Sequence, residues 1–207
     1  MNFKNYRLER LIIFIIILFL FCSWLAGLVD DILKQWPAIE KINKITHSFS
    51  TLSLMLLFIF FVNAIGWKWK IFKLLVDIPN LNGRYRGEVI SSYNNEKKQC
   101  TIEIKQNASS IHIYAYFADH GQMEASSSSH SVTEEIIKKE NGFFRIYYIF
   151  ANDTSVLEGE PRNHGGTAFL DYYPDNKKLQ GEYYNQRLNR GSIVVEFVQE
   201  NLLGRLT

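Results

Sequence analysis

The sequence has few cysteines and prolines and no metal-binding motif, and each shortage excludes a class of protein. It holds 2 cysteines and 4 prolines among 207 residues. Cys22 lies in an apolar run and Cys100 in an expected strand, so they cannot form a disulfide framework, and we expect free thiols. The histidines are scattered, without CxxC or HExxH spacing, so no metal site is expected.

Excess charge and catalytic motifs are also absent. Lys and Arg number 23 and Asp and Glu 21, which leaves a formal net charge of +2. Binding to a nucleic-acid polymer needs a surplus of cations, so we expect no such partner. The sequence lacks a nucleophile elbow and a phosphate-binding GxxxxGK[ST] loop. Glu134 and Glu135 are adjacent, so on a strand they point to opposite faces. We predict a protein that is not an enzyme and needs no cofactor.

Two long runs without charge are the strongest feature of the first 77 residues. Leu11–Val29 (LIIFIIILFLFCSWLAGLV) would reach about 28 Å as a helix, close to the apolar thickness of a bilayer. It is apolar on every face, unlike a surface helix. Phe49–Trp67 is also free of charge, and Trp at such an end is typical of a membrane boundary. A short polar link joins the two runs. The sequence therefore predicts a two-helix transmembrane hairpin for residues 1–77, with spans at about 11–29 and 49–67.

Cations flank this hairpin on its outer sides and predict its orientation. They are Lys4, Arg7, Arg10, Lys68, Lys70 and Lys73. The lysines of the link are offset by acidic neighbours, so the positive-inside rule predicts that both termini and the downstream domain are cytoplasmic. A cleaved signal peptide is the alternative. Against it, the apolar run is long, an A-x-A cleavage pattern is not clear, and a second run follows directly.

From Ile78 onward the hydrophobic period becomes alternating, as in strands. Residues 78–207 are enough for one domain with its own core. Turn residues separate eight expected strands: Gly83–Ser91, Gln99–Gln106, Ser110–Phe117, Gln122–Lys138, Gly142–Ala151, Gly166–Tyr173, Leu179–Asn185 and Gly191–Val198. Sequential strands without intervening helices predict an all-β domain that is an eight-stranded up-and-down antiparallel barrel, minimal and lipocalin-like. A two-sheet sandwich is the alternative.

Alternation along the strands suggests which side chains share the interior. In the first strand Gly83, Tyr85 and Gly87 form the expected inward face, since glycine permits sharp coiling. In the fifth strand Arg145 and Tyr147 share a face with apolar residues, as Thr167 does in the sixth. Polar groups on such faces are candidates for ligand contacts, because a barrel of this size holds packed side chains or one small ligand.

The same residues also have structural interpretations. Arg145 and Asp171 would as readily form an ion pair, and Tyr85 and Tyr183 fit the role of core aromatics better than that of ligand-stacking residues. The segment RLNRG at 187–191 would equally be a solvated turn.

The second apolar run contains small and polar residues that favour contacts between helices. These are Ser50, Ser53, Asn63 and Gly66. Asn63 is costly in lipid unless it is paired, so it either joins helices across copies or lies at a water-facing end.

The whole architecture resembles a known family. Two apolar spans precede an all-β domain that opens with LNGRYRGEV and closes with GTAFLDYYPDNKKLQGEYYNQRLNRGSIVVEF. The short motifs are Gly83-x-Tyr85-x-Gly87, Gly181-x-Tyr183 and Arg190-Gly191. This arrangement resembles the two-transmembrane β-barrel effectors of CBASS anti-phage systems.

The resemblance implies a signal-gated effector. In that family a cyclic dinucleotide, made by a CD-NTase that detects phage, binds the barrel. The protein then forms a homo-oligomer, and its transmembrane helices disrupt the bacterial inner membrane, which causes abortive infection. Two phosphates and two bases call for cations, stacking aromatics and amide or hydroxyl groups. Residues of these types that are expected on neighbouring strands and a turn are Tyr85, Arg145, Tyr147, Thr167, Tyr183, Asn185, Arg187 and Arg190.

Two other functions remain open from the sequence. A constitutive membrane-tethered lipocalin-like binding protein for a lipid or small molecule would have an apolar interior that no cation reaches. A membrane scaffold would instead use its barrel to dock another protein.

Overall fold

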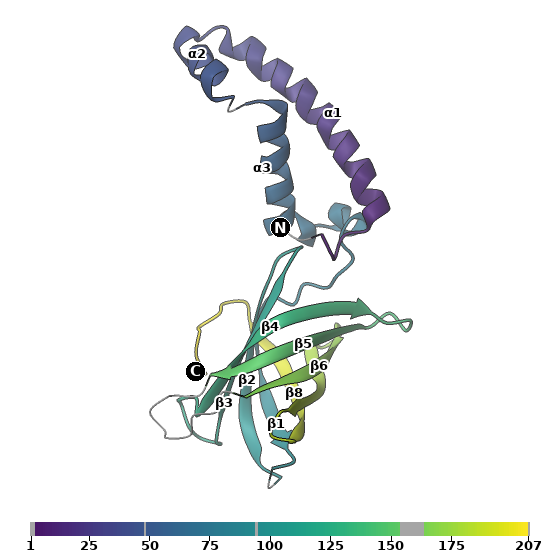
Figure 1. Cartoon of the computed structure of the whole chain (residues 1–207), viewed down its shortest axis with the longest axis vertical. Helices are drawn as coiled ribbons and strands as arrows, with labels where there is room; N and C mark the ends of the chain where they lie inside the picture. The colour runs from purple at the N-terminus through teal and green to yellow at the C-terminus, as the bar shows by residue number, and fades with distance from the viewer. Residues whose placement is uncertain (1–2, 48, 94, 154–163, 207) are drawn as a thin grey trace. The chain divides into compact units, whose positions relative to one another are not determined.

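The computed structural model describes residues 3–47, 49–93, 95–153 and 164–206. The chain divides into two compact units. The first is Met1–Asp77 together with the turn Asn107–Ser109, and the second is Ile78–Gln106 with Ser110–Thr207. The elements, in chain order, are α1 (Leu8–Leu33), α2 (Pro37–Thr46), α3 (Thr51–Ala64), η1 (Gly66–Lys68), η2 (Lys70–Leu74), β1 (Gly83–Ser91), β2 (Lys97–Gln106), β3 (Ile111–Ala118), β4 (Ser127–Lys138), β5 (Phe144–Asp153), β6 (Gly165–Tyr173), β7 (Lys178–Asn185) and β8 (Arg190–Gln199) (Figure 1).

Helix α1 is the long apolar element of the first unit. Its 26 residues reach about 39 Å, and its most apolar stretch has a mean hydropathy of 2.9 with 11% of its residues buried. Among the described residues it is the one helix that is long and apolar enough to cross a membrane. The chain therefore carries an N-terminal apolar helix suited to membrane association. The second predicted span corresponds to α3, an apolar helix of 14 residues.

Helix α3 is shorter than the predicted span because both of its ends are defined locally. Ser50 is its N-cap, and the Ser50 side chain accepts a hydrogen bond from the Ser53 backbone N–H (3.3 Å). After Ala64 the chain turns into the short 3₁₀ helices η1 and η2. The predicted polar link is itself partly helical, because α2 begins with Pro37 at a position where its missing N–H costs nothing.

The chain segments that flank the helices of the first unit lie side by side. Tyr6 and Val76 form an antiparallel bridge, and the Arg7 backbone N–H donates to the Leu75 carbonyl (2.9 Å). The Arg7 side chain also forms an ion pair with Asp77 (2.5 Å). The chain thus returns after α3 to the level at which α1 begins.

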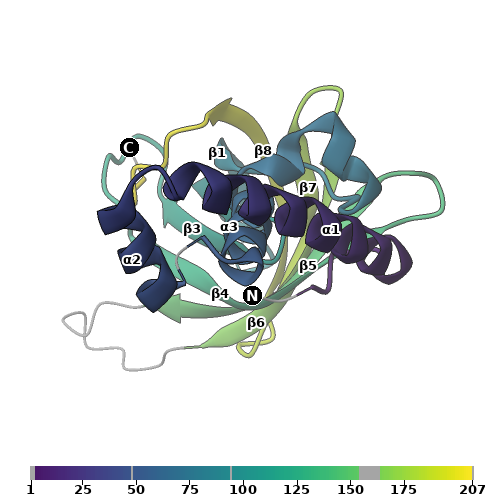
Figure 2. The ribbon, with the colours of Figure 1, turned by 90° about the horizontal axis from the view of Figure 1, so that it is seen from above.

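The second unit is a closed barrel in which the strands follow each other in the order β1 to β8, and β8 pairs with β1 (Figures 1 and 2). Every neighbouring pair is antiparallel. The predicted up-and-down barrel of eight strands is confirmed, and the sandwich alternative is wrong. β4 begins at Ser127, later than the predicted Gln122.

Buried side chains fill the barrel at the end where β1 begins. The side chains with the least exposure include Leu81, Tyr85, Ile102, Ile104, Ile113, Ile146, Leu170, Leu179 and Val195. Neighbouring strands approach very closely at several glycines, and most closely at Gly87 and Gly181. A Cβ at Gly87 would lie 2.0 Å from the Val194 carbonyl oxygen, and one at Gly181 would lie 1.8 Å from that of Phe169. This end of the barrel is therefore filled by side chains.

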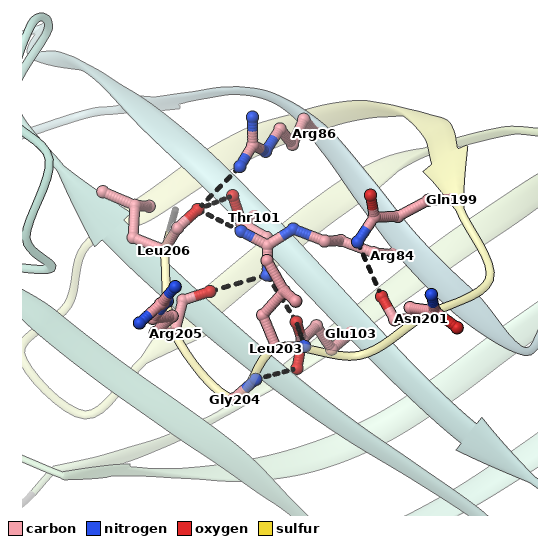
Figure 3. Close-up of polar contacts among 10 residues, drawn as sticks. All are labelled: Arg84, Arg86, Thr101, Glu103, Gln199, Asn201, Leu203, Gly204, Arg205 and Leu206. Atoms are coloured by element: carbon pink, nitrogen blue, oxygen red, sulfur yellow. Dashed lines mark hydrogen bonds and ion pairs between the residues drawn. The ribbon is translucent and has the colours of Figure 1, made fainter.

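The segment after β8 binds to side chains of β1 and β2, next to the pairing of β1 with β8 that closes the barrel (Figure 3). We call residues 200–206 the C-terminal clasp. On the outer face of β1 and β2, the fully buried Arg84 forms an ion pair with Glu103 and donates to the carbonyls of Arg205 (2.6 Å) and Leu206. Glu103 accepts hydrogen bonds from the backbone N–H groups of Leu203 (2.8 Å) and Gly204 (3.0 Å). A segment attached to β8 is thereby held by side chains of β1 and β2.

Candidate functional site

A cavity of about 430 Å³ opens at the barrel mouth opposite the packed end. This size is within the usual range for small-molecule sites, roughly 300–1,000 Å³. Its lining residues are Val89, Ser91, Tyr93, Glu96, Lys98, Phe117, Ser127, Ser129, Tyr148, Phe150, Asn152, His164, Tyr183, Asn185, Arg187, Asn189 and Ile193. The cavity therefore draws on all strands of the barrel except β6, next to which His164 lies.

Strand alternation positions these side chains. Successive residues point to opposite faces, so Tyr148, Phe150 and Asn152 of β5 all project toward the cavity. Tyr183 and Asn185 of β7 share a face in the same way. The polar groups come from the strand ends, where the barrel opens to water.

Aromatic rings form the wall of the cavity. The ring centroids of Tyr148 and Phe150 are 6.3 Å apart, and those of Phe150 and Tyr183 are 6.5 Å apart with an interplanar angle of 70°. Burial raises the pKa of Tyr148, so its hydroxyl stays neutral at physiological pH. Flat apolar faces of this kind can stack on nucleobases.

Charged and amide groups lie around the mouth. The Lys98 ammonium is 3.4 Å from an Asp119 carboxylate oxygen and 3.7 Å from one of Glu96. Arg187 lies in the turn between β7 and β8. The Asn185 side-chain oxygen accepts hydrogen bonds from the backbone N–H groups of Arg187 and Asn189, both at 3.0 Å. Asn185 therefore organises the turn that carries Arg187.

Of the eight ligand-site residues predicted from the sequence, three line the cavity. They are Tyr183, Asn185 and Arg187. Tyr85 faces inward as predicted, but it belongs to the packed end of the barrel. It is 1% exposed, and its hydroxyl donates to the Leu81 carbonyl (3.0 Å). Tyr85 is therefore a core residue, and its hydroxyl has its hydrogen-bond partner within the chain.

The other four predicted residues, Arg145, Tyr147, Thr167 and Arg190, lie on the outer face of the barrel. Their inward neighbours include Ile146, Tyr148 and Ala168. The inward face expected for the fifth and sixth strands is therefore wrong, and the alternation runs the other way. A part in ligand binding for these four residues stays a prediction.

Arg145 has the structural partner that the alternative interpretation expected. Its guanidinium makes two hydrogen bonds to Asp171, at 2.7 Å and 2.5 Å, and lies 4.3 Å from the Phe169 ring centroid. These hydrogen bonds lower the pKa of Asp171, and the nearby charges of Arg145 and Lys139 lower it further.

The residues predicted to associate helices have contacts within the first unit. Ser50 and Ser53 cap α3. Gly66 lies against Phe61 and Phe72, each 3.3 Å from where a Cβ would be. Association across copies stays a prediction for these residues.

Asn63 is held by the turn Asn107–Ser109. Its side-chain oxygen accepts from the Ser109 hydroxyl (2.5 Å), and its carbonyl accepts from the Ala108 N–H (3.0 Å). The Asn5 side chain donates to the Ala108 carbonyl (3.0 Å). This turn joins β2 to β3, so an element of the barrel chain is anchored within the helical unit.

Residues missed by the sequence analysis include Tyr148, Phe150, Asn152 and Lys98. The signal was present, because Ile146, Tyr148 and Phe150 share a period-2 face, but the other face of β5 carries the similarly apolar Tyr147 and Ile149. Among the described residues, no group of three or more His, Cys, Asp or Glu side chains could hold a metal ion. Burial raises the pKa of the Cys100 thiol to about 12, which keeps it unreactive.

The fold and the cavity together define a small-ligand receptor barrel that follows an apolar helix suited to membrane association. The chain belongs to the family described as Cap15, cyclic dinucleotide receptor domain, whose model matches residues 76–196. The resemblance to CBASS effectors is thereby confirmed, and the barrel is a cyclic dinucleotide receptor domain. No curated protein matches the chain.

Proposed function

We propose that this protein is a CBASS effector in which a cyclic dinucleotide enters the barrel cavity and activates the membrane unit. Binding leads to self-association, and the helices then disrupt the bacterial inner membrane, which ends the infection by killing the infected cell. The observation that carries the proposal is the aromatic, cation-bearing cavity at the open mouth of a barrel of this receptor family.

The composition of the cavity supports a nucleotide over a lipid. Tyr148, Phe150 and Tyr183 offer ring faces to bases, and Asn152 offers an amide for base edges. Arg187 brings a guanidinium to the mouth, as phosphates require, whereas the charge of Lys98 is offset by Glu96 and Asp119. A lipocalin-like carrier of apolar molecules would keep cations away from its pocket, so Arg187 disfavours that rival.

The membrane part of the proposal rests on α1 and α3. We infer that both cross the bilayer, because the bridged Tyr6 and Val76 return the chain to its starting side. The cations that flank this pair of helices favour cytoplasmic termini and a cytoplasmic barrel.

The turn Asn107–Ser109 is our proposed route from the cavity to the helices. It is covalently continuous with β2 and β3, whose far ends carry the cavity residues Lys98 and Phe117. A change in these strands would therefore reach Asn63 through the Ser109 hydrogen bond. Ligand shifts such a system only through different affinities for its two states.

Calorimetry on the full chain in detergent tests the binding step. Cyclic di-AMP, cyclic di-GMP and cyclic GMP-AMP serve as probes. We expect at least one of them to bind, and Tyr183→Ala to weaken that binding by about fivefold or more, since base stacking contributes roughly 1–3 kcal/mol. Tyr147→Ala is the matched control, because Tyr147 lies on the outer face. Binding that Tyr147→Ala weakens and Tyr183→Ala leaves unchanged would place the ligand outside the cavity.

A further inference from the structure

Two glycines on the inner face of the barrel lie directly opposite aromatic residues of the cavity wall. Gly166 of β6 pairs with Phe150 of β5, and Gly191 of β8 pairs with Tyr183 of β7. Residues that face each other on neighbouring strands point to the same side of a sheet. Since both rings line the cavity, the two glycines face the interior as well. Each ring therefore has a neighbour without a side chain on the next strand.

The rings occupy the space that side chains at these glycines would fill. A Cβ at Gly191 would lie 2.4 Å from the Cε1 atom of Tyr183, and one at Gly166 would lie 2.5 Å from the Cζ atom of Phe150. Carbon atoms in favourable contact are about 3.5–4.0 Å apart. Neither ring could therefore keep its place beside an alanine.

Backbone conformation does not account for either glycine. Neither Gly166 nor Gly191 is among the glycines with a positive φ, so other residues could adopt the same backbone conformation. Glycine in the interior of a strand is destabilising, and it often marks a place that another group approaches closely. What these two positions require is room.

Close approach of the strands accounts for part of this requirement. At both positions a Cβ would also lie 2.3 Å from a carbonyl oxygen of the adjacent strand, that of Ile90 for Gly191 and that of Tyr184 for Gly166. Gly87 differs from both, because the three atoms nearest to its Cβ position all belong to the backbone. Gly87 is therefore the matched case of strand contact without ring contact.

Strand β6 shows the same arrangement one position further into the barrel. Its inward residue Ala168 pairs with Tyr148 on one side and with Tyr183 on the other. Among the described residues that line the cavity, none belongs to β6. The small residues of β6 therefore leave this part of the wall to rings from β5 and β7.

We propose that Gly166 and Gly191 are positioning residues of the nucleotide site, which let the Phe150 and Tyr183 rings lie against the wall, where they leave the cavity open and can stack on bases. A side chain at either glycine would lie between the ring and the sheet and would push the ring into the cavity. The inference deepens the proposed function and rests on it for the ligand, whereas the placement of the rings is measurable without a ligand.

Fluorine NMR on the full chain in detergent tests the placement of the rings. With 3-fluorotyrosine at position 183, we expect Gly191→Ala to move the fluorine resonance, and a soluble gadolinium chelate to broaden it more, because the ring is displaced into the open cavity. Gly87→Ala should leave both unchanged. With 4-fluorophenylalanine at position 150, Gly166→Ala should have the same effect. Resonances that stay in place in variants that circular dichroism shows to be folded would overturn the proposal.

Calorimetry on the same chains tests the consequence for binding, with cyclic di-AMP, cyclic di-GMP and cyclic GMP-AMP as probes. Gly191→Ala should weaken binding about fivefold or more, as the loss of one stacking ring would. In a chain that already carries Tyr183→Ala, adding Gly191→Ala should change the dissociation constant by less than about twofold, because the glycine acts through the ring. Equal losses in both backgrounds would assign Gly191 to the packing of the barrel and overturn the proposal.

Two further outcomes are also decisive. Chains that show the expected fluorine shifts but bind none of the three probes would contradict the proposed function, whereas the placement of the rings would stand. If Gly191→Ala alone does not fold, adding Tyr183→Ala removes the ring that the new Cβ meets, and the double variant should fold. A double variant that also fails to fold would assign Gly191 to its contact with the Ile90 carbonyl and overturn the proposal.

Discussion

Arg187 and Arg145 give the clearest test of whether the ligand binds in the cavity or on the outer face of the barrel. Arg187 lies in the turn at the barrel mouth, whereas Arg145 is engaged by Asp171 on the outside. A charge-assisted hydrogen bond contributes about 1.5–3 kcal/mol, so Arg187→Ala should raise the dissociation constant of the bound cyclic dinucleotide about tenfold or more. Arg145→Ala should leave it unchanged. Calorimetry on both variants checks this, and the reverse pattern would move the ligand to the outer face.

The ion pair of Arg145 and Asp171 predicts a pH-dependent stability. The folded-state pKa of Asp171 is lowered, so the pair stabilises the fold above the ordinary carboxyl pKa of about 3.9, and the effect is lost as the pH falls through the folded-state value. Asp171→Asn should cost about 1 kcal/mol at pH 7, typical of a partly exposed pair, and almost nothing at a pH below the lowered folded-state pKa of Asp171. Urea unfolding of the full chain in detergent, followed by circular dichroism, measures it. A cost that is equal at both pH values would assign the loss to packing.

At the scale of single residues, the sequence identified part of the site. Tyr183, Asn185 and Arg187 were predicted and line the cavity. The face of β5 was not predictable, because Tyr147 and Ile149 look as apolar as Ile146 and Tyr148. Only the closure of the barrel decides which of these two faces turns inward.

Among the elements, the C-terminal clasp depends on one buried ion pair. Arg84→Met leaves Glu103 buried without its counter-charge, and this should lower the free energy of unfolding by about 3–5 kcal/mol. Adding Glu103→Leu removes the stranded charge, so the double variant should lose less than the sum of the single losses. Chemical denaturation of the single and double variants completes the cycle. Additive losses would show that the two charges do not stabilise each other.

The turn Asn107–Ser109 predicts a variant that separates binding from membrane damage. Ser109→Ala removes the hydroxyl that donates to Asn63 and weakens the anchorage by about 1–3 kcal/mol. We expect the same dissociation constant for the nucleotide but less nucleotide-triggered dye release from liposomes. Ser192→Ala, an exposed serine on β8, is the matched control. Equal dye release from both variants would remove this turn from the coupling route.

The sequence predicted the elements better than their connections. Period-2 alternation and turn residues located all eight strands, because each strand has local signals. The ends of α3 and the presence of α2 depend on a serine cap and on Pro37, which are weak signals inside an apolar run and a polar link. The clasp and the anchored turn join residues far apart in the sequence, and no local pattern records such contacts.

In the whole molecule, a receptor barrel follows a unit of apolar helices after a short connection. The family match covers the barrel, and α1 supplies a helix of membrane-spanning length. The central claim is that occupancy of the cavity controls what the helices do.

Dye release from liposomes that contain the full chain tests this claim most directly, with release recorded before and after addition of a cyclic dinucleotide that calorimetry shows to bind. The account predicts intact liposomes without nucleotide, and release that rises with occupancy of the cavity and is weakened in parallel with binding by Arg187→Ala. Equal release with and without nucleotide, or no release at saturating occupancy, would contradict it.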